Sequence, residues 1–296
     1  MSKLEALTLT NGPLLFSAQA RGDGPVVLCL HGFPDTLRTF DALLDALSEA
    51  GFRGVAPAMR GYEPQSQPAD GDYHAVRMAE DVAVWIDQLG GGPVHLVGHD
   101  WGATIAFAAA ALVPEKVRSL TVLAVPHPVR FAENYAGSAA QQARSQYIID
   151  FQSPAADAAI VEDNCAWLEK LCRTWSPGWA EPEPALEAMR ETFLLPGVAN
   201  ATLNWYRQAF DATSEAGSAT QALLSQAVRA PTLGLVGETD GCIAAEIFTA
   251  SMLPADFPAG LEVDQMPGAG HFLHLEQPGP VARRVIAWLR QCEAGK

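Results

Sequence analysis

The sequence has few basic residues and no long apolar stretch. Lysine and arginine total 19 of 296 residues against 34 aspartates and glutamates, which gives a net charge of −15. Such an excess of negative charge repels phosphate backbones and anionic lipid, so we expect neither nucleic-acid binding nor membrane binding. The longest nearly apolar stretch, Ala103–Val113, is about half the length that a membrane-spanning helix needs.

Cysteine is also scarce. The chain has five cysteines and no Cys-x-x-Cys pair, so disulfide bonding would leave at least one thiol unpaired. We therefore expect reduced thiols and a cytoplasmic protein. The histidines and acids lack the spacing of metal ligands, and Gly90–Gly92 precedes a strand instead of joining a strand to a helix. Neither a metal nor a dinucleotide cofactor is expected.

Short apolar runs alternate with helical patterns over the first 125 residues and again after residue 231. The first of these runs, Val26–Leu30, is continuously apolar, as expected for a strand that is covered on both faces. Such alternation is typical of an α/β fold with a mostly parallel sheet and helices on both faces. The predicted strands are 26–30, 55–57, 94–97, 117–125, 232–236 and 261–266, and the predicted helices are 40–51, 74–89, 102–112 and 280–289.

Between residues 127 and 228 the alternation stops, and the stretch is too long for a loop. It has helical patterns and holds four of the seven tryptophans. An aromatic-rich helical insertion between two parallel strands would lie over their carboxyl ends, where such sheets bind ligands. An ordinary helical subdomain with an aromatic core is the alternative. We predict a core of residues 1–126 and 229–296 and a helical cap of residues 127–228.

The strongest functional signal is Gly-His-Asp-Trp-Gly at residues 98–102. It follows the predicted strand 94–97 and opens a helix of small residues, which is the strand-turn-helix setting of a nucleophile elbow. Glycines are expected there because the tight turn brings neighbouring backbone too close for side chains. A surface turn would explain the segment in isolation, but this setting favours Asp100 as a nucleophile.

An aspartate at the centre of the elbow determines the expected chemistry. A carboxylate is already ionised, so it can displace a leaving group at saturated carbon and form an ester with the enzyme. His271 lies in a glycine-flanked loop after the last predicted strand and is the candidate base for hydrolysing that ester. Asp240, after the strand 232–236, is the candidate acid that orients it. Their rivals are His274 and Glu238, and His99 is expected to be structural.

The loop after the strand 26–30 carries His-Gly-Phe-Pro at residues 31–34. In a fold with a nucleophile elbow, this loop supplies one backbone N–H of an oxyanion hole, and the residue after the nucleophile supplies the other. We therefore assign the two donors to Phe33 and Trp101. They would stabilise the negative oxygen that forms when water attacks the Asp100 ester.

With these motifs the sequence resembles the α/β-hydrolase superfamily and, more narrowly, the soluble epoxide hydrolases. The resemblance spans nearly the whole chain and rests on His31–Pro34, Arg60–Tyr62, Gly98–Gly102 and Gly270–His271, which match in order and spacing. It implies an α/β-hydrolase fold with a cap, no cofactor, and a small apolar epoxide as substrate.

The resemblance also implies two cap tyrosines that hydrogen-bond the epoxide oxygen and donate a proton as the ring opens. One lies in an Asn-Trp-Tyr-Arg segment and matches Tyr206; the other precedes a Phe-Gln-x-Pro segment and matches Tyr147, with Tyr135 as the alternative. Without the family, helix packing would explain either side chain. The same resemblance implies that three further residues contact the substrate: His31, Pro34 and Trp205.

Two other functions share parts of this pattern. Haloalkane dehalogenases usually have Asn after His-Gly, where this chain has Phe33, and fluoroacetate-type dehalogenases follow the nucleophile with Arg, where it has Trp101. A catalytically silent binding protein on the same fold is an alternative of another class. We expect hydrolysis of an epoxide to a vicinal diol, through an ester on Asp100 and water activated by His271.

Overall fold

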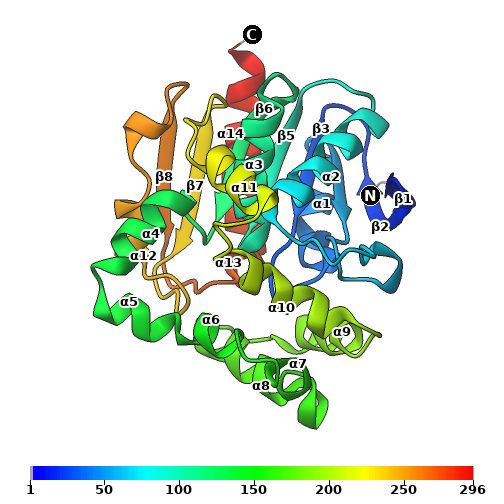
Figure 1. Ribbon diagram of the computed structural model, residues 1–296. Coiled ribbons are helices and arrows are strands. Elements are labelled where there is room, and N and C mark those ends of the chain that lie inside the picture. Colours follow the sequence, from blue (N-terminus) through cyan, green and yellow to red (C-terminus); the bar gives the residue numbers. More distant parts are fainter. Residues whose placement is uncertain (1–2, 296) are drawn as a thin grey trace.

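The structure is a computed structural model that describes residues 3–295. Eight strands form one sheet in the order β1-β2-β4-β3-β5-β6-β7-β8 (Figure 1). The strands from β4 to β8 in this order are parallel, whereas β1 and β2 form an antiparallel hairpin at one edge. Their bounds are β1 Glu5–Asn11, β2 Leu14–Arg21, β3 Val26–Leu30, β4 Arg53–Pro57, β5 Val94–His99, β6 Val117–Leu123, β7 Thr232–Gly237 and β8 Leu261–Met266.

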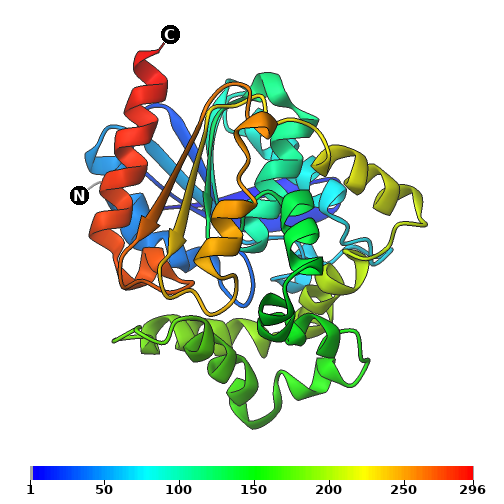
Figure 2. The ribbon, with the colours of Figure 1, turned by 90° about the vertical axis from the view of Figure 1, so that its left-hand side faces the viewer.

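Helices cover both faces of the sheet (Figure 2). The helices α1 (Asp41–Glu49) and α14 (Pro278–Ala294) pack against one face, and α2 (Ala75–Gln88) and α3 (Trp101–Leu112) against the other. Alanines fill the middle of α3 and are fully buried or nearly so, which lets α3 lie close to both β5 and α2. The shorter helices near the sheet are α12 (Ala245–Ala250), α13 (Leu273–Glu276), η1 (Leu37–Phe40), η2 (Pro64–Ser66), η3 (Pro114–Lys116) and η4 (Pro254–Asp256).

A group of helices lies between β6 and β7 in the chain, and all but its first and last members lie beyond the carboxyl ends of the strands in space (Figure 1). They are α4 (Pro128–Ala136), α5 (Ala139–Arg144), α6 (Gln146–Asp150), α7 (Ala156–Ala159), α8 (Glu162–Trp175), α9 (Glu183–Phe193), α10 (Val198–Gln208) and α11 (Glu215–Leu224). The first contacts α12, and α11 contacts α2 and α3, so both ends of this insertion pack on the core. The division of the chain into a core and a cap of residues 127–228 stays a prediction.

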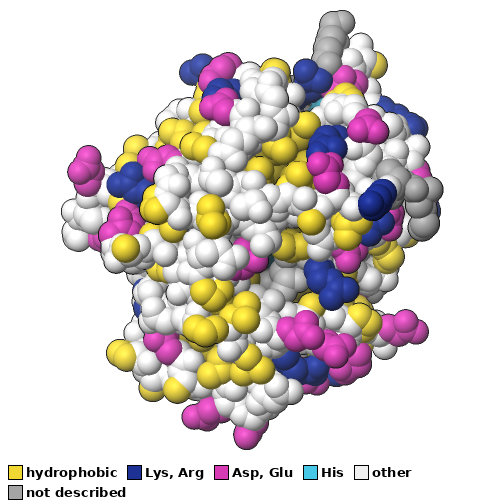
Figure 3. Space-filling view, turned by 90° about the vertical axis from the view of Figure 1, so that its right-hand side faces the viewer, with side chains coloured by type: hydrophobic (Ala, Val, Ile, Leu, Met, Phe, Trp, Pro, Cys, Tyr) yellow, Lys and Arg dark blue, Asp and Glu magenta, His cyan; other side chains and the backbone are white. Residues whose placement is uncertain are grey.

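The predicted fold class is confirmed in its architecture, because the sheet is mostly parallel and helices lie on both of its faces. Each predicted strand and helix of the core is present within a few residues of its expected bounds. The hairpin of β1 and β2 was not predicted. No helix within residues 3–295 combines the length and the hydrophobicity that crossing a membrane requires. On the face in Figure 3, acidic and basic side chains are interspersed.

Candidate active site

The nucleophile elbow has the geometry that its sequence predicts. Asp100 joins β5 to α3 with a φ of 52° and a ψ of −124°, a strained conformation for a residue with a side chain. A Cβ on Gly98 would lie 2.4 Å from the carbonyl oxygen of Gly102, and one on Gly102 would lie 1.9 Å from that of Leu30. Both positions therefore require glycine.

The two oxygens of the Asp100 carboxylate have different neighbours. Oδ1 accepts a hydrogen bond from the Phe33 N–H at 2.7 Å, and Oδ2 lies 3.5 Å from Nε2 of His271. A Cβ on Gly32 would lie 2.4 Å from Oδ1, so this approach requires glycine. Within residues 3–295 the carboxylate accepts no hydrogen bond from Trp101, and the second oxyanion donor stays a prediction.

The structure brings the predicted base and acid together beside the nucleophile. His271 Nδ1 is 3.0 Å from Oδ2 of Asp240, and both side chains are buried. The other oxygen of Asp240 accepts hydrogen bonds from the N–H groups of Cys242 and Ile243, at 2.7 and 3.0 Å. These two bonds fix the carboxylate so that it faces His271.

The rivals for these roles lie elsewhere. Glu238 is exposed and accepts a hydrogen bond from the Gly268 N–H at 2.8 Å. Nε2 of His274 is 2.5 Å from the Thr39 hydroxyl instead of facing Asp100. The geometry therefore favours Asp240 and His271.

Two carboxylates control the charge of His271. Burial by itself lowers the pKa of this imidazole, but the neighbouring Asp240 and Asp100 outweigh that effect and raise it to about 10. At neutral pH the ring is therefore an imidazolium between two carboxylates.

Both predicted cap tyrosines reach the site from the insertion. Tyr147 on α6 and Tyr206 on α10 have ring centroids 5.8 Å apart, and both are nearly fully buried. Burial, together with charged neighbours that include Asp100, raises both pKa values well above the usual range, so both hydroxyls stay protonated. Within the described residues the Tyr206 hydroxyl makes no hydrogen bond of normal geometry, although the Trp101 side chain is close enough to act on its pKa. Tyr135 packs beside Phe131 on α4 and is only half-buried.

Apolar rings surround these hydroxyls. Tyr206 lies 5.2 Å from Phe33, 5.1 Å from Trp101 and 5.0 Å from Phe151, measured between ring centroids. All of these contacts are edge-to-face. The space beside the nucleophile is therefore lined by aromatic side chains, which suits an apolar molecule.

The residues predicted to bind substrate mainly contact the protein. His31 donates from Nδ1 to the Gly32 carbonyl and accepts from the Met59 N–H at Nε2, and burial lowers its pKa to about 4. Trp205 donates its indole N–H to the Arg60 carbonyl at 3.1 Å. Pro34 follows a cis peptide bond. Contact of these side chains with a substrate stays a prediction.

Sequence reasoning missed two residues at the site. The Tyr62 hydroxyl donates to the Gly32 carbonyl at 2.8 Å, and the Cys242 thiol lies 3.4 Å from the Tyr147 hydroxyl. Tyr62 belongs to the Arg-Gly-Tyr motif, which supported the family resemblance, but no specific role was predicted for this tyrosine. The only signal for Cys242 was its place two residues after Asp240.

Two buried clusters within the described chain have side chains that suit a metal ion. One is Asp100, Cys242 and His271, and the other is Asp35, His99 and His274. In each, the possible ligand atoms lie within 4.8 Å of one another. The residues of each cluster come from segments far apart in the chain, so their spacing in the sequence does not resemble that of known metal ligands.

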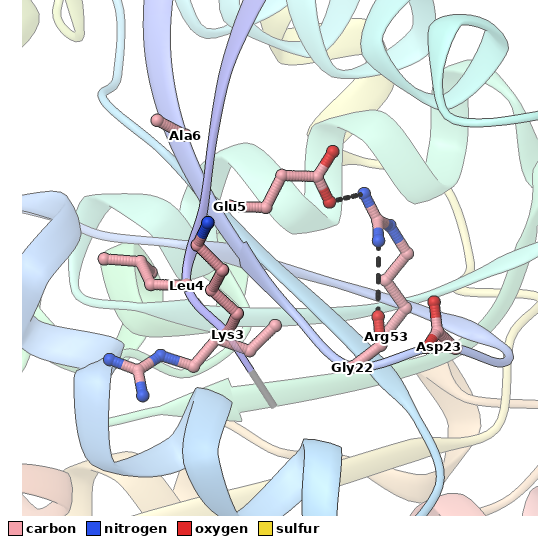
Figure 4. A pocket seen from close by; sticks show the side chains of 8 residues that line it. Lys3, Leu4, Glu5, Ala6, Gly22, Asp23 and Arg53 are labelled. Atoms are coloured by element: carbon pink, nitrogen blue, oxygen red, sulfur yellow. Dashed lines mark hydrogen bonds and ion pairs between the residues drawn. The ribbon is translucent and has the colours of Figure 1, made fainter. Parts of the chain in front are cut away.

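Two surface hollows differ in their relation to this site. The larger, about 500 Å³, lies beside β1 and β2, where Arg53 bonds to Glu5 and to the Gly22 carbonyl (Figure 4). None of the predicted site residues lines it. The smaller, about 220 Å³, is bordered by His31, Tyr62 and residues of α9.

Comparisons with known proteins agree with the fold and identify the family. The model of the alpha/beta hydrolase fold family matches residues 25–278. An epoxide hydrolase of Caballeronia sordidicola is 30% identical, over 96% of this chain and 93% of its own. Epoxide hydrolase A of Mycobacterium tuberculosis is 29% identical over 98% of both. The crystal structure of an epoxide hydrolase from Vigna radiata superposes with a TM-score of 0.80 at 25% identity, covering 97% and 98% of the two chains.

Proposed function

The chain belongs to the α/β-hydrolase fold family and, within it, to the epoxide hydrolases, and from this premise we propose how it hydrolyses an epoxide. Asp100 opens the epoxide and forms an ester, and water activated by His271 then hydrolyses this ester to a vicinal diol. The observation that carries this proposal is that the two oxygens of the Asp100 carboxylate have different neighbours. One oxygen is held by the Phe33 N–H, and the other faces the reaction space and His271.

In the first step, Oδ2 of Asp100 attacks an epoxide carbon. The ring oxygen becomes an alkoxide, which needs a proton because the surrounding aromatic rings do not solvate it. Tyr147 and Tyr206 keep their protons, since burial raises both pKa values. Acid assistance from such donors is worth roughly 10²–10⁴-fold.

The second step depends on the loss of the negative charge of Asp100 in the first step. Esterified Asp100 is neutral, so one of the two carboxylates that raise the pKa of His271 is lost. The imidazolium then gives up its proton, which replaces the one that a tyrosine lost. Neutral His271, held by Asp240, takes a proton from water as the water attacks the ester carbon. The Phe33 and Trp101 N–H groups stabilise the resulting oxyanion. The oxyanion collapses by breaking the bond between the Asp100 carbonyl carbon and the diol oxygen, which takes the proton of the new carboxyl group. Asp100 is then again a carboxylate and His271 an imidazolium.

The aromatic lining supports a small apolar or aromatic epoxide as the substrate. The reaction consumes only water and needs no cofactor. All five cysteines are free thiols, four of them buried. This supports a reducing compartment, the cytoplasm, as the place of action.

Dehalogenation by the same nucleophile is less well supported. Phe33 stands where haloalkane dehalogenases usually have the Asn that helps hold the halide, and the Trp205 indole N–H is used by the Arg60 carbonyl. Epoxides, haloalkanes and haloacetates assayed in parallel with the purified protein separate these reactions. A binding protein would leave all of them unchanged.

The His271→Gln variant tests the two steps separately. We expect it to form the Asp100 ester but to hydrolyse it slowly, so that the intact protein gains the mass of one epoxide. The Tyr135→Phe variant is the control, because Tyr135 lies outside the ring cluster of the site, and it should turn over normally without an adduct. Binding of the epoxide to His271→Gln without an adduct would contradict this assignment.

A single turnover in ¹⁸O-labelled water, with enzyme in excess, identifies the atom that water attacks. Attack on the ester carbon leaves ¹⁸O in the Asp100 carboxylate, where peptide mass spectrometry detects it. Label in the diol alone would mean that water attacks the epoxide directly, and the ester mechanism would be wrong.

A further inference from the structure

A cluster of three buried side chains lies behind the reacting groups and has no role in the proposed reaction. Asp35 comes from the loop after β3, His99 is the last residue of β5, and His274 lies on α13. They are 7%, 0% and 3% exposed. The three segments that carry these residues therefore come together in one buried polar cluster.

The protonation of His99 follows from its partner. Nε2 of this ring lies 3.1 Å from the carbonyl oxygen of His271. A carbonyl can only accept a hydrogen bond, so Nε2 carries the proton and donates it. In a neutral ring, Nδ1 then presents a lone pair.

That lone pair faces a carboxylate oxygen. Nδ1 of His99 lies 3.4 Å from Oδ2 of Asp35, and within residues 3–295 neither atom makes a hydrogen bond. The other oxygen of Asp35 already accepts from the Thr36 N–H at 2.9 Å. Two buried acceptors facing each other at this distance repel unless a positive charge lies between them.

His274 provides a third possible ligand atom near Oδ2 of Asp35. Its Nε2 lies 3.9 Å from Oδ2 of Asp35 and 2.5 Å from the Thr39 hydroxyl. In a tetrahedral site with bonds of about 2.0–2.1 Å, neighbouring ligand atoms are roughly 3.4 Å apart. The observed separations of 3.4 and 3.9 Å approach this value, and the third pair of ligand atoms lies within 4.8 Å. To bind an ion, the three side chains would draw together and Nε2 of His274 would exchange its bond to Thr39 for the metal.

We propose that Asp35, His99 and His274 form a binding site for a divalent transition metal ion, for which Zn²⁺ is the probe. Two imidazoles and one carboxylate are a donor set that first-row transition metals bind well. The hydrogen bond from the far nitrogen of His99 to a carbonyl is the support that metal-binding histidines usually have. A bound ion would link the loop after β3, the elbow and the segment that carries His271.

The first test measures Zn²⁺ binding to the wild-type protein and identifies the atoms that bind the ion. After dialysis against a chelator, calorimetric titration should show one Zn²⁺ bound per chain. X-ray absorption of the complex should show only nitrogen and oxygen neighbours. A sulfur neighbour at about 2.3 Å would place the ion at Asp100, Cys242 and His271 and overturn the proposal. Absence of Zn²⁺ binding would also overturn it.

Variants give the second test. Asp35→Asn and His274→Gln should each weaken Zn²⁺ binding by about tenfold or more, whereas Cys242→Ser should bind like the wild type. Thermal unfolding with and without Zn²⁺ reports on folding: the ion should raise the Tm of the wild type and of Cys242→Ser, but not of Asp35→Asn. Equal binding by all four proteins would refute the site. None of these measurements depends on epoxide turnover.

Discussion

Tyr62 holds one peptide group of the active site in the orientation that the proposed reaction needs. Its hydroxyl donates to the Gly32 carbonyl, and the N–H at the other end of the same peptide, that of Phe33, donates to Asp100. Because a peptide group is planar, fixing its carbonyl also fixes its N–H. Tyr62 is fully buried, and its ring packs edge-on against His31. It therefore positions the oxyanion donor without touching the reacting atoms.

The Tyr62→Phe variant should slow hydrolysis of the ester more than its formation, because negative charge develops beside the Phe33 N–H in the second step. We expect kcat to fall about tenfold, less than the roughly 10²–10³-fold that follows loss of a whole oxyanion donor. Rapid-quench mass spectrometry should then show accumulated ester. Tyr73→Phe is the control, because the charged neighbours of its hydroxyl are Arg60 and Asp70 and not the proposed catalytic groups, and it should have no such effect. Equal slowing of both steps would argue against a positioning role.

The raised pKa of His271 makes stability depend on pH. The folded protein holds a proton on this ring up to about pH 10, whereas the unfolded chain releases it near 6.5. The stabilisation is therefore complete below about pH 6.5 and is lost as the pH rises toward 10. In that window the free energy of unfolding should fall by up to roughly 1.4 kcal/mol per pH unit. Chemical denaturation of the wild type and of His271→Gln should show their difference shrinking from pH 6.5 to 10; a constant difference would mean that the folded ring is neutral.

Residue positions differed in how well they could be predicted from the sequence. Asp100, Asp240 and His271 each follow a predicted parallel strand, and such strands end at one edge of a sheet. Tyr62 and Cys242 escaped prediction because their contacts depend on side-chain directions in loops. The Asp35 cluster escaped for the same reason, since nothing in the sequence relates that loop to α13.

At the scale of elements, the elbow depends on how closely α3 approaches β3. A Cβ on Gly102 would lie 1.9 Å from the Leu30 carbonyl oxygen and 2.5 Å from its carbon. Both are backbone atoms in a central strand, so they cannot move aside as a flexible side chain could. The glycine therefore sets the distance between the helix and the sheet at the nucleophile.

Gly102→Ala should lower the free energy of unfolding by about 3 kcal/mol or more, at the upper end of overpacking effects. Gly92→Ala is the matched control, because a Cβ there meets no atom within 4 Å, and it should change stability by no more than about 0.5 kcal/mol. Urea denaturation measures both. If the two variants unfold at the same urea concentration, the close approach of α3 does not constrain the fold.

The elements that could be predicted are those with a strong apolar period. β3 is buried along almost its whole length and is continuously apolar, whereas β5 is fully buried and apolar apart from His95, Gly98 and His99. β1 escaped prediction because it is an edge strand with mostly exposed or half-buried residues. The turn at Gly12–Pro13 was the signal that could have revealed the hairpin.

At the scale of the whole molecule, the reaction centre is closed off. Asp100 is 4% exposed and His271 is fully buried, so we expect the helices of the insertion to shift when a substrate enters. Gln208, at the end of α10, bonds the insertion to the core at two points. Its side-chain oxygen accepts from the Tyr73 N–H at 2.7 Å, and its amide donates to the Gly71 carbonyl at 2.8 Å. Tyr206 lies on the same helical turn.

The Gln208→Ala variant should loosen α10 and with it the hydroxyl of Tyr206. Losing two hydrogen bonds should cost about 1–3 kcal/mol of stability, and amide exchange should speed up over residues 71–75 and 198–208. We expect KM for an epoxide to rise and kcat to fall, because Tyr206 spends less time in place. Gln142→Ala is the control, since that side chain bonds only to the carbonyls of Tyr135 and Ala136 within the insertion. If exchange speeds up while KM and kcat stay unchanged, Tyr206 does not depend on this attachment, and the substrate enters past another part of the insertion.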